Sequence, residues 1–306
     1  MKVLILGANG LVGSSLTRTL KNTDIVSEII TSTREDTNLF SFDETSNLIK
    51  NSKPNIVINA AAKVGGIYAN NTKRANFIID NLKINLNVLE SCINDNSIKI
   101  INLGSSCIYP LNAQNPIKEE YFMTGVLEPT NSPYAMSKLS SIEIGRAMKD
   151  QYGHKVINLM PTNLYGPNDN FSEEDSHVIP GLIKRMHKSK IENADEFKIW
   201  GSGKPLREFL FVDDLSDAVE HLINNDINED LLNIGSGVEI SILDLAEKIK
   251  KVIKFEGSLA FDDSKPDGNP RKLIDSTKIN NLGWKHTTSL DEGLKVTYDW
   301  FLKNIA

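Results

Sequence analysis

The chain has 306 residues, of which 40% are hydrophobic and 24% charged, and it carries a formal net charge of -6. This length is enough for a sizeable core and for a nucleotide-binding domain plus a smaller one. The net negative charge argues against a nucleic-acid or anionic-membrane partner. Two cysteines cannot form a disulfide framework, no apolar stretch reaches the ~18 residues of a bilayer span, and the first apolar run is too short for a signal peptide. We therefore expect a soluble, cytoplasmic protein.

The first apolar run, residues 2 to 6, has strand length and gives way to helical periodicity from residue 11 to residue 20. Gly7, Gly10 and Gly13 lie between the two and allow a tight turn and a close approach to a pyrophosphate at the helix N-terminus. Their G-x-x-G-x-x-G spacing differs from the common G-x-G-x-x-G form. Its position directly after a strand nevertheless predicts a dinucleotide-binding loop.

The second strand is expected at residues 25 to 31, and the charged residues after it bear on the choice of cofactor. An acidic residue here would bond the ribose 2′-hydroxyl of NAD, whereas an arginine can pair with the 2′-phosphate of NADP. Arg34 favours NADP, while the adjacent Glu35 and Asp36 keep NAD open. Arg34 could also be only a solvated loop charge.

Further strand-like runs at 55 to 60, 98 to 103 and 155 to 160 alternate with helical segments, including those near 80 to 93 and 134 to 150. This alternation predicts an α/β fold with a doubly wound parallel sheet of the Rossmann type over residues 1–160. From Pro161 onward the pattern loosens into helices near 178 to 190, 214 to 224 and 241 to 254, separated by turns at 201 to 205 and 264 to 270. Residues 161–306 are therefore predicted to form a second, smaller α/β domain that binds the substrate.

Tyr134 and Lys138 lie four residues apart in a predicted helix, so they share one face about one turn apart. A lysine charge close to the phenol would bring its pKa from ~10 toward neutral pH, which makes it a usable proton donor. This spacing alone also occurs by chance. Ser105 and Ser106 follow the strand at 98 to 103, where they could donate a hydrogen bond to a substrate carbonyl or only cap the next turn.

Longer motifs make the chain resemble the GDP-L-fucose synthase family of extended short-chain dehydrogenase/reductases. They are Asn59–Ile67 (NAAAKVGGI), Leu103–Pro110 (LGSSCIYP), Leu127–Asn131 (LEPTN), Pro161–Pro167 (PTNLYGP), Ser176–Pro180 (SHVIP), Trp200–Gly203 (WGSG) and Ser264–Gly268 (SKPDG). The resemblance implies an NADP(H)-dependent 3,5-epimerase/4-reductase acting on a GDP-linked 4-keto-6-deoxy sugar. It also implies a homodimer formed through the helices near 80 to 93 and 134 to 150, and a return to the main sheet at about 208–234, beginning with Phe209–Asp214.

The resemblance also implies roles for single residues. The catalytic residues are Ser105, Cys107, Tyr134, Lys138 and His177. Those that bind the nucleotide sugar are Arg185, Trp200, Arg207 and Asp267. Those that bind the cofactor are Gly7, Ala8, Asn9, Gly10, Leu11, Val12, Gly13, Arg34, Asn38, Leu39, Leu103, Gly104, Ser105, Ser106, Lys138, Pro161, Thr162, Asn163, Leu164 and His177. Asn9 stands where relatives with a strong NADP preference carry an arginine.

The chemistry of a 4-keto sugar explains these residue types. Inverting C3 or C5 requires that a proton leave one face and return to the other, so two opposed groups are needed. A thiol and an imidazole, with ordinary pKa values near ~8.5 and ~6.5, bracket neutral pH and suit the base and acid roles of Cys107 and His177. Tyr134 and a serine hydroxyl would hold the enolate oxygen at C4 and later serve its reduction.

Alternative interpretations stay open. Cys107 could be an inert buried hydrophobe and His177 a surface histidine. We expect no metal, because the other histidines lack partners at ligand spacing: His154, His187, His221 and His286. Two other functions remain: a reductase or epimerase for another 4-keto sugar, such as one of a heptose pathway, and a cofactor-sensing protein without turnover.

Overall fold

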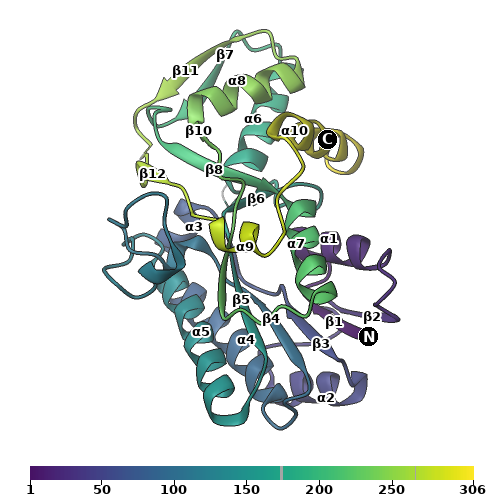
Figure 1. Ribbon diagram of the computed structural model, residues 1–306. Coiled ribbons are helices and arrows are strands. Elements are labelled where there is room, and N and C mark those ends of the chain that lie inside the picture. The colour runs from purple at the N-terminus through teal and green to yellow at the C-terminus, as the bar shows by residue number, and fades with distance from the viewer. Residues whose placement is uncertain (173–174, 266) are drawn as a thin grey trace.

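Six parallel strands form the main sheet of the computed structural model, in the order β2-β1-β3-β4-β5-β9 (Figure 1). The structure describes residues 1–172, 175–265 and 267–306, so Pro266 of the Ser264–Gly268 motif lies outside the described residues. The strands are β1 (Lys2–Leu6), β2 (Glu28–Ser32), β3 (Ile56–Asn59), β4 (Lys99–Leu103), β5 (Val156–Pro161) and β9 (Leu231–Ile234). This order confirms the predicted doubly wound parallel sheet, in which all carboxyl ends lie on one edge.

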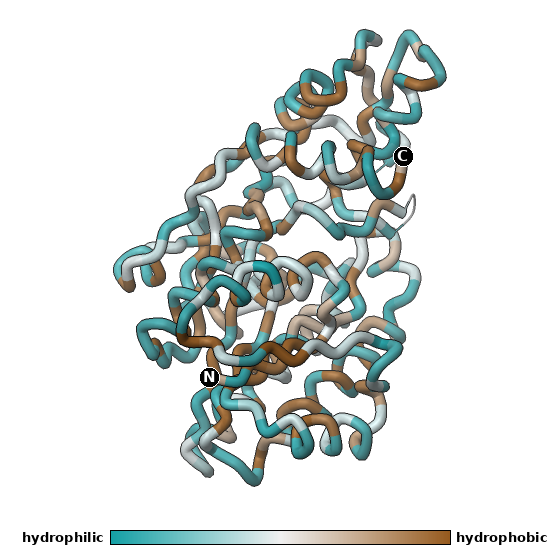
Figure 2. The backbone as a smooth tube through the Cα atoms, turned by 90° about the vertical axis from the view of Figure 1, so that its right-hand side faces the viewer, coloured by the Kyte–Doolittle hydropathy of each residue, from teal (hydrophilic) through white to brown (hydrophobic). Residues whose placement is uncertain are grey.

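Helices cover both faces of this sheet because the strands are apolar on both sides. Val3 and Ile5 of β1 pack with α1 (Leu11–Leu20) and α7 (Val212–Asn224), whereas Leu4 and Leu6 pack on the opposite face. That face is covered by α2 (Phe42–Ser52), α4 (Arg74–Cys92) and α5 (Ser132–Tyr152). In Figure 2 hydrophobic stretches of the backbone gather near the N-terminus, where the first strand begins.

A second lobe lies beyond the carboxyl ends of the main strands (Figure 1). Its sheet contains β6 (Asn163–Tyr165), β8 (Leu206–Phe211), β10 (Glu239–Ser241) and β12 (Arg271–Lys272), and a separate pair is formed by β7 (Glu196–Trp200) and β11 (Ser258–Asp262). Its helices are α6 (Val178–Ile191), α8 (Ile242–Ile253) and α10 (Leu290–Asn304). Aromatic side chains from β7, β8 and α10 fill its core.

The predicted return to the main sheet is wrong in one detail. Phe209–Phe211 belong to β8, which pairs with β6, β10 and β12 in the second lobe. The chain returns through α7 and then β9, which pairs with β5. The sequence pattern does not distinguish the two sheets, because an apolar strand has both faces buried in either one.

The remaining elements are short. They are α3 (Ile67–Thr72), α9 (Thr277–Asn281) and the 3₁₀ turns η1 (Ser106–Ile108) and η2 (Glu119–Tyr121). Helix α4 begins six residues earlier than the expected segment near 80, which exceeds the usual uncertainty of such boundaries, whereas the shift of β2 toward Ser32 lies within it. Over the described ranges, no helix combines the length and the apolar character that a membrane crossing requires.

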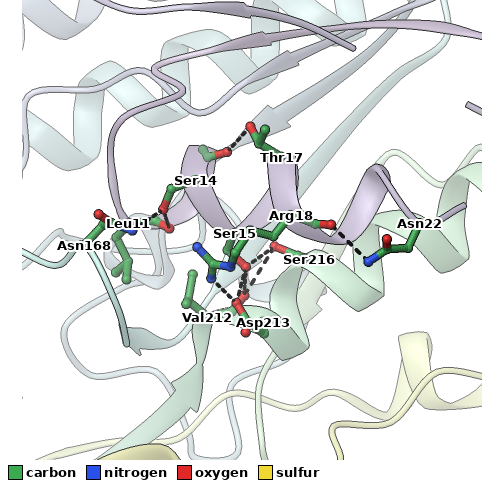
Figure 3. Close-up of polar contacts among 11 residues, drawn as sticks. Leu11, Ser14, Ser15, Thr17, Arg18, Asn22, Asn168, Val212, Asp213 and Ser216 are labelled. Atoms are coloured by element: carbon green, nitrogen blue, oxygen red, sulfur yellow. Dashed lines mark hydrogen bonds and ion pairs between the residues drawn. The ribbon is translucent and has the colours of Figure 1, made fainter. Parts of the chain in front are cut away.

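A buried polar seam joins the first helix to the returning helix (Figure 3). The Ser15 hydroxyl, fully buried on α1, donates to the Asp213 carboxylate at 2.6 Å and lies 2.6 Å from the Ser216 hydroxyl. Arg18 pairs with the same Asp213 oxygen at 2.6 Å. On the other side of α1, the Asn168 amide donates to the Ser14 hydroxyl at 3.1 Å. The glycine-loop helix is thus fixed by segments that come almost 200 residues later.

Replacing Ser15 with Ala should lower the free energy of unfolding by about 1–3 kcal/mol, because Ser216 and the charged Asp213 lose a buried partner. Denaturant unfolding measures the change. Ser52→Ala is the control: the Ser52 hydroxyl donates only to carbonyls of its own helix, so its loss should cost about 0.5 kcal/mol or less. Equal effects of the two substitutions would contradict a special role for the seam.

Candidate active site

The turn after β1 has the geometry of a phosphate-binding loop. Gly7 has φ +76°, and a Cβ there would lie 2.8 Å from the Ala61 Cα. A Cβ on Gly13 would lie 2.2 Å from the Gly7 carbonyl oxygen, so only glycine lets α1 pack this closely on the turn. Helix α1 begins after Gly10 without a side-chain cap. Its first N–H groups therefore present a site for an anion at the carboxyl edge of the sheet.

One of the two acidic residues after β2, Asp36, is engaged within its own loop. The Asp36 carboxylate accepts the Thr33 N–H at 2.8 Å and its hydroxyl at 2.7 Å, which turns Asp36 back into its own loop. Arg34 is exposed, as are Glu35 and Asn9. Further along, the Asn38 N–H donates to Glu44, and the Leu39 carbonyl accepts the Asn87 amide. The loop thus offers a guanidinium for a 2′-phosphate and commits the Asp36 carboxylate elsewhere.

Tyr134 and Lys138 lie together on α5, but burial decides their pKa values. The Lys138 ammonium is 5.7 Å from the centre of the Tyr134 ring and donates to the Leu103 carbonyl at 2.7 Å. Burial raises the pKa of Tyr134, with a further contribution from Cys107, and it lowers the pKa of Lys138 to about 8. In the protein alone the pKa of Tyr134 is thus raised by desolvation, and does not move toward neutral pH as the spacing with Lys138 predicts. Tyr134 is held in the protonated form that a proton donor needs.

The loop after β4 carries Ser105 and Cys107 side by side. The Ser105 hydroxyl accepts the Cys107 N–H at 3.3 Å and so caps η1, as the simpler alternative expected. This bond uses a lone pair of the oxygen, so the hydroxyl hydrogen remains able to donate to a carbonyl. Ser106 and Gly104 are buried below it. Ser105 can therefore combine a structural role with a donor role.

Cys107 is a buried thiol surrounded by cations. It is only 6% exposed, and burial raises its pKa. Lys272, the Ser105 hydroxyl and Lys138 act in the opposite direction and favour the thiolate. Cys92, the last residue of α4, is buried in the core and has a pKa raised to about 12 by burial, as expected of an inert core thiol. Cys107 differs from Cys92 through these positive neighbours, which are typical of a functional cysteine.

Sequence reasoning missed Lys272. It lies in β12, paired with Arg207 of β8, and burial lowers its pKa while Cys107 and Glu128 raise it. A lone lysine near the end of a polar loop carries no sequence signal of its own. Its nearness in the chain to the Ser264–Gly268 motif is the one feature that could have singled it out.

His177 precedes α6 as its N-cap residue and is exposed, so its ring is accessible. The protein packed around it still lowers its pKa, because burial disfavours the imidazolium. Burial thus favours the neutral imidazole at His177 and the neutral thiol at Cys107. Burial therefore shifts both the imidazole and the thiol toward their uncharged forms, relative to their ordinary pKa values.

Cations and an aromatic ring gather in the second lobe at the residues predicted to bind the nucleotide sugar. The Arg185 guanidinium lies 4.2 Å from the centre of the Trp200 ring, and the Lys265 ammonium lies 5.5 Å from it. Trp200 is 46% exposed, so the ring has open surface on which a base can stack. Burial lowers the pKa of Arg185 to about 10, against the opposing effect of Asp262.

Arg207 and Asp267 are joined by a hydrogen bond in the same lobe. The Arg207 guanidinium donates to the Leu206 and Asp267 carbonyls at 2.8 and 3.5 Å. The Asp267 carboxylate accepts the Ser202 N–H and hydroxyl, both at 2.7 Å, so it shapes the turn after Trp200. Asp267 therefore supports this turn, whereas Arg207 and Lys272 supply positive charge.

The stretch that connects the two lobes also lies at the carboxyl edge. Pro161 ends β5, and the Thr162 hydroxyl and the Asn163 amide both donate to the Glu208 carbonyl, at 3.1 and 2.8 Å. Leu164 packs against the main core. Glu208 is fully buried, and its carboxylate accepts the N–H groups of Gly237 and Ile274 at 2.7 and 3.1 Å. These bonds fix the connection beside the predicted cofactor site.

Three of the other histidines have hydrogen-bond partners: His154 contacts the Ile93 carbonyl, His187 the Tyr298 hydroxyl and His221 the Leu282 carbonyl. In the part of the chain that the structure describes, no group of three His, Cys, Asp or Glu side chains could hold a metal ion.

Comparison with known proteins gives the wider relationship. Residues 3–235 match the NAD dependent epimerase/dehydratase family. The chain belongs to this family. It is 47% identical to GDP-L-fucose synthase 1 of Arabidopsis thaliana, over 100% of this chain and 94% of that protein.

Solved structures agree with this relationship. A GDP-L-fucose synthetase from Naegleria fowleri bound to NADP matches with a TM-score of 0.90 and 30% identity, over 99% of this chain and 94% of that one. A GDP-6-OMe-4-keto-L-xylo-heptose reductase from C. jejuni matches with a TM-score of 0.91 and 31% identity, over 99% and 97%.

The electrostatic environment of Cys107 can be tested on the protein alone. Thiolate absorbance in the ultraviolet, taken as the difference between the wild type and Cys107→Ser, should report a pKa above the ordinary value. Lys272→Met should raise this pKa further, because a neighbouring positive charge is lost. Lys265→Met is the control, since Lys265 lies against Trp200 and should leave the titration unchanged. A pKa that is unchanged or lower in Lys272→Met would exclude Lys272 as the neighbour that favours the thiolate.

Proposed function

We propose that the protein converts GDP-4-keto-6-deoxy-D-mannose to GDP-L-fucose by NADPH-dependent 3,5-epimerisation and 4-reduction. The observation that carries the proposal is the position of Cys107 in η1, which contacts α5, the helix of Tyr134 and Lys138. The thiol thus lies beside the pair that a carbonyl reductase needs. The full-length similarity to proteins named GDP-L-fucose synthase supports the same activity.

The protein's own residues fit the cofactor. The glycine turn and the uncapped start of α1 accept a pyrophosphate, and Arg34 accepts a 2′-phosphate. When bound, NADPH supplies the hydride for C4. Lys138, already bonded to the Leu103 carbonyl, is placed to hold the nicotinamide ribose. Residues 1–160, with the return at about 208–234, form the cofactor part in this proposal, and residues 161–306 bind the nucleotide sugar.

Epimerisation requires an acidified C–H bond next to the C4 carbonyl. Tyr134 and Ser105 donate hydrogen bonds to the C4 oxygen and so stabilise the enolate. Cys107, as thiolate, removes a proton at C3 or C5 and becomes the thiol. His177, as imidazolium, gives a proton to the other face and becomes neutral. Because burial keeps the resting thiol protonated, the cations Lys272 and Lys138 are what make the thiolate accessible. After hydride arrives at C4, Tyr134 gives its proton to the alkoxide.

The second lobe holds the GDP group. Trp200 offers a face for the guanine, and Arg185 and Arg207 supply cations for the diphosphate. Both guanidinium groups are partly desolvated, which strengthens their attraction for an anion.

Assay of the purified protein with GDP-4-keto-6-deoxymannose and NADPH in deuterated water tests the proposal. NMR of the product should show GDP-L-fucose with deuterium at C3 and C5. Cys107→Ser should suppress this deuterium while some direct C4 reduction continues. Tyr134→Phe should slow NADPH oxidation by ~10²-fold or more, the scale of general acid catalysis.

Four results would contradict the proposal. Unchanged deuterium in Cys107→Ser would remove Cys107 from the base role. Full activity in Tyr134→Phe would overturn its role as the acid. Turnover of a GDP-heptose 4-ketone in place of the 6-deoxy sugar would favour the heptose alternative, and NADPH oxidation that is independent of any keto sugar would contradict both.

We also propose that the protein is a cytoplasmic homodimer that pairs through α4 and α5. Ile79 and Leu86 of α4 and Met136 of α5 are 49%, 47% and 46% exposed, an unusual amount of apolar surface on neighbouring helices. A shallow depression between these helices, lined by Ala75, Ile78, Pro133 and Met136, continues this surface.

Sedimentation should give twice the chain mass for the wild type and one chain mass for Leu86→Glu combined with Met136→Glu, because a buried charge opposes association. Val296→Glu, at a position 46% exposed on α10, should leave the dimer intact. A wild-type monomer would contradict the proposed pairing.

A further inference from the structure

We infer that Gly66 and the Lys73–Asp175 ion pair are positioning elements that set the place of His177, and with it the balance between epimerisation and reduction. This inference rests on the proposed function. The reducing residues Ser105, Tyr134 and Lys138 all belong to the first lobe. His177 precedes α6, whose side chains pack in the core of the second lobe, so its position depends on contacts between the lobes.

The connection between β3 and α4 is rigid. The Asn81 side chain accepts the Lys63 N–H at 2.8 Å and donates to the Lys63 carbonyl at 3.0 Å. The Asn70 amide donates to the carbonyls of Gly65 and Gly66 at 2.7 and 3.0 Å. Both asparagines are buried, so this segment cannot easily move.

The loop that carries His177 docks on this rigid segment through its backbone. The Gly66 N–H donates to the Asp175 carbonyl at 3.1 Å. A Cβ on Gly66 would lie 2.6 Å from the Ser176 carbonyl oxygen. No side chain could therefore stand at position 66 without displacing the backbone one residue before His177. Helix α6, which follows His177, also packs closely on this loop. A Cβ on Gly181 of this helix would lie 2.8 Å from the Ser176 hydroxyl.

A charged contact fixes the same loop from outside. The Lys73 ammonium donates to both Asp175 carboxylate oxygens, at 3.1 and 3.0 Å. Both side chains are partly exposed, so truncating the pair would cost little stability. A reversed charge would instead bring two carboxylates near each other, and their repulsion would displace the loop. The adjacent Arg74 donates to the carbonyls of Pro129 and Thr130, just before the helix of Tyr134. The start of α4 thus holds both loops.

This geometry predicts a selective defect. A displacement of His177 by an ångström would spoil proton return to the sugar, whereas the reducing residues would keep their places. The readout that distinguishes the two cases is the ratio of epimerised to unepimerised 6-deoxy sugar among the products, compared at the same amount of NADPH oxidised. A merely structural effect would lower both products together and leave this ratio unchanged.

The test compares charge variants of the full-length protein with GDP-4-keto-6-deoxymannose and NADPH in deuterated water. In Lys73→Glu, deuterium at C3 and C5 per NADPH oxidised should fall about tenfold, and unepimerised product should appear. The swap Lys73→Glu with Asp175→Lys should restore the ratio. Gly66→Ala should shift it in the same direction as Lys73→Glu, without any change of charge.

Lys248→Glu is the matched control. Lys248 also donates to both oxygens of a carboxylate, Asp291, at 2.8 and 2.9 Å, but this pair joins α8 to α10. Its reversal should leave the ratio unchanged. An unchanged ratio in Lys73→Glu, or a swap that fails to restore it, would overturn the inference alone. A wild type that introduces no deuterium would overturn the proposed function and the inference together.

Discussion

Desolvation at the carboxyl edge of the main sheet is the constraint on which the rest of the site depends. Cys107 and Lys138 are both buried there, and burial favours the uncharged form of each group. The phenol of Tyr134 is raised in pKa for the same reason. Such an environment keeps the phenol ready to donate a proton. It also means that any anion formed in the site must be stabilised by fixed neighbours.

Those neighbours come from both lobes. Lys138 is fixed by the Leu103 carbonyl in the first lobe, whereas Lys272 arrives on β12 of the second. The fold places them together because β5 leads directly into β6 at the carboxyl edge, and α7 and β9 bring the chain back. The site is therefore complete only when the lobes are held in register. The bond from Gly66 to the Asp175 carbonyl is one place where this register is fixed.

Much of the fold could be predicted from the sequence because its signals are local. The apolar run before Gly7 and the alternation of strands and helices specify the parallel sheet without knowledge of distant contacts. The site was harder to predict from the sequence. The spacing of Tyr134 and Lys138 correctly placed them on one helix face, but the direction of the phenol's pKa depends on burial, which is a tertiary property. The role of Lys272 and the pairing of β8 could not be predicted from the sequence for the same reason. Each depends on strand pairing between segments far apart in the chain.

The central claim is that one pocket serves two reactions at the same carbonyl, with a thiol and an imidazole on opposite faces of the sugar ring. A crystal structure of the protein with NADP and a GDP-linked 6-deoxy sugar tests it most directly. The account predicts the sugar C4 between the nicotinamide and Tyr134, with Cys107 facing one side of the ring and His177 the other. Both side chains on one face, or Cys107 directed away from the sugar, would contradict it and leave a simple reductase.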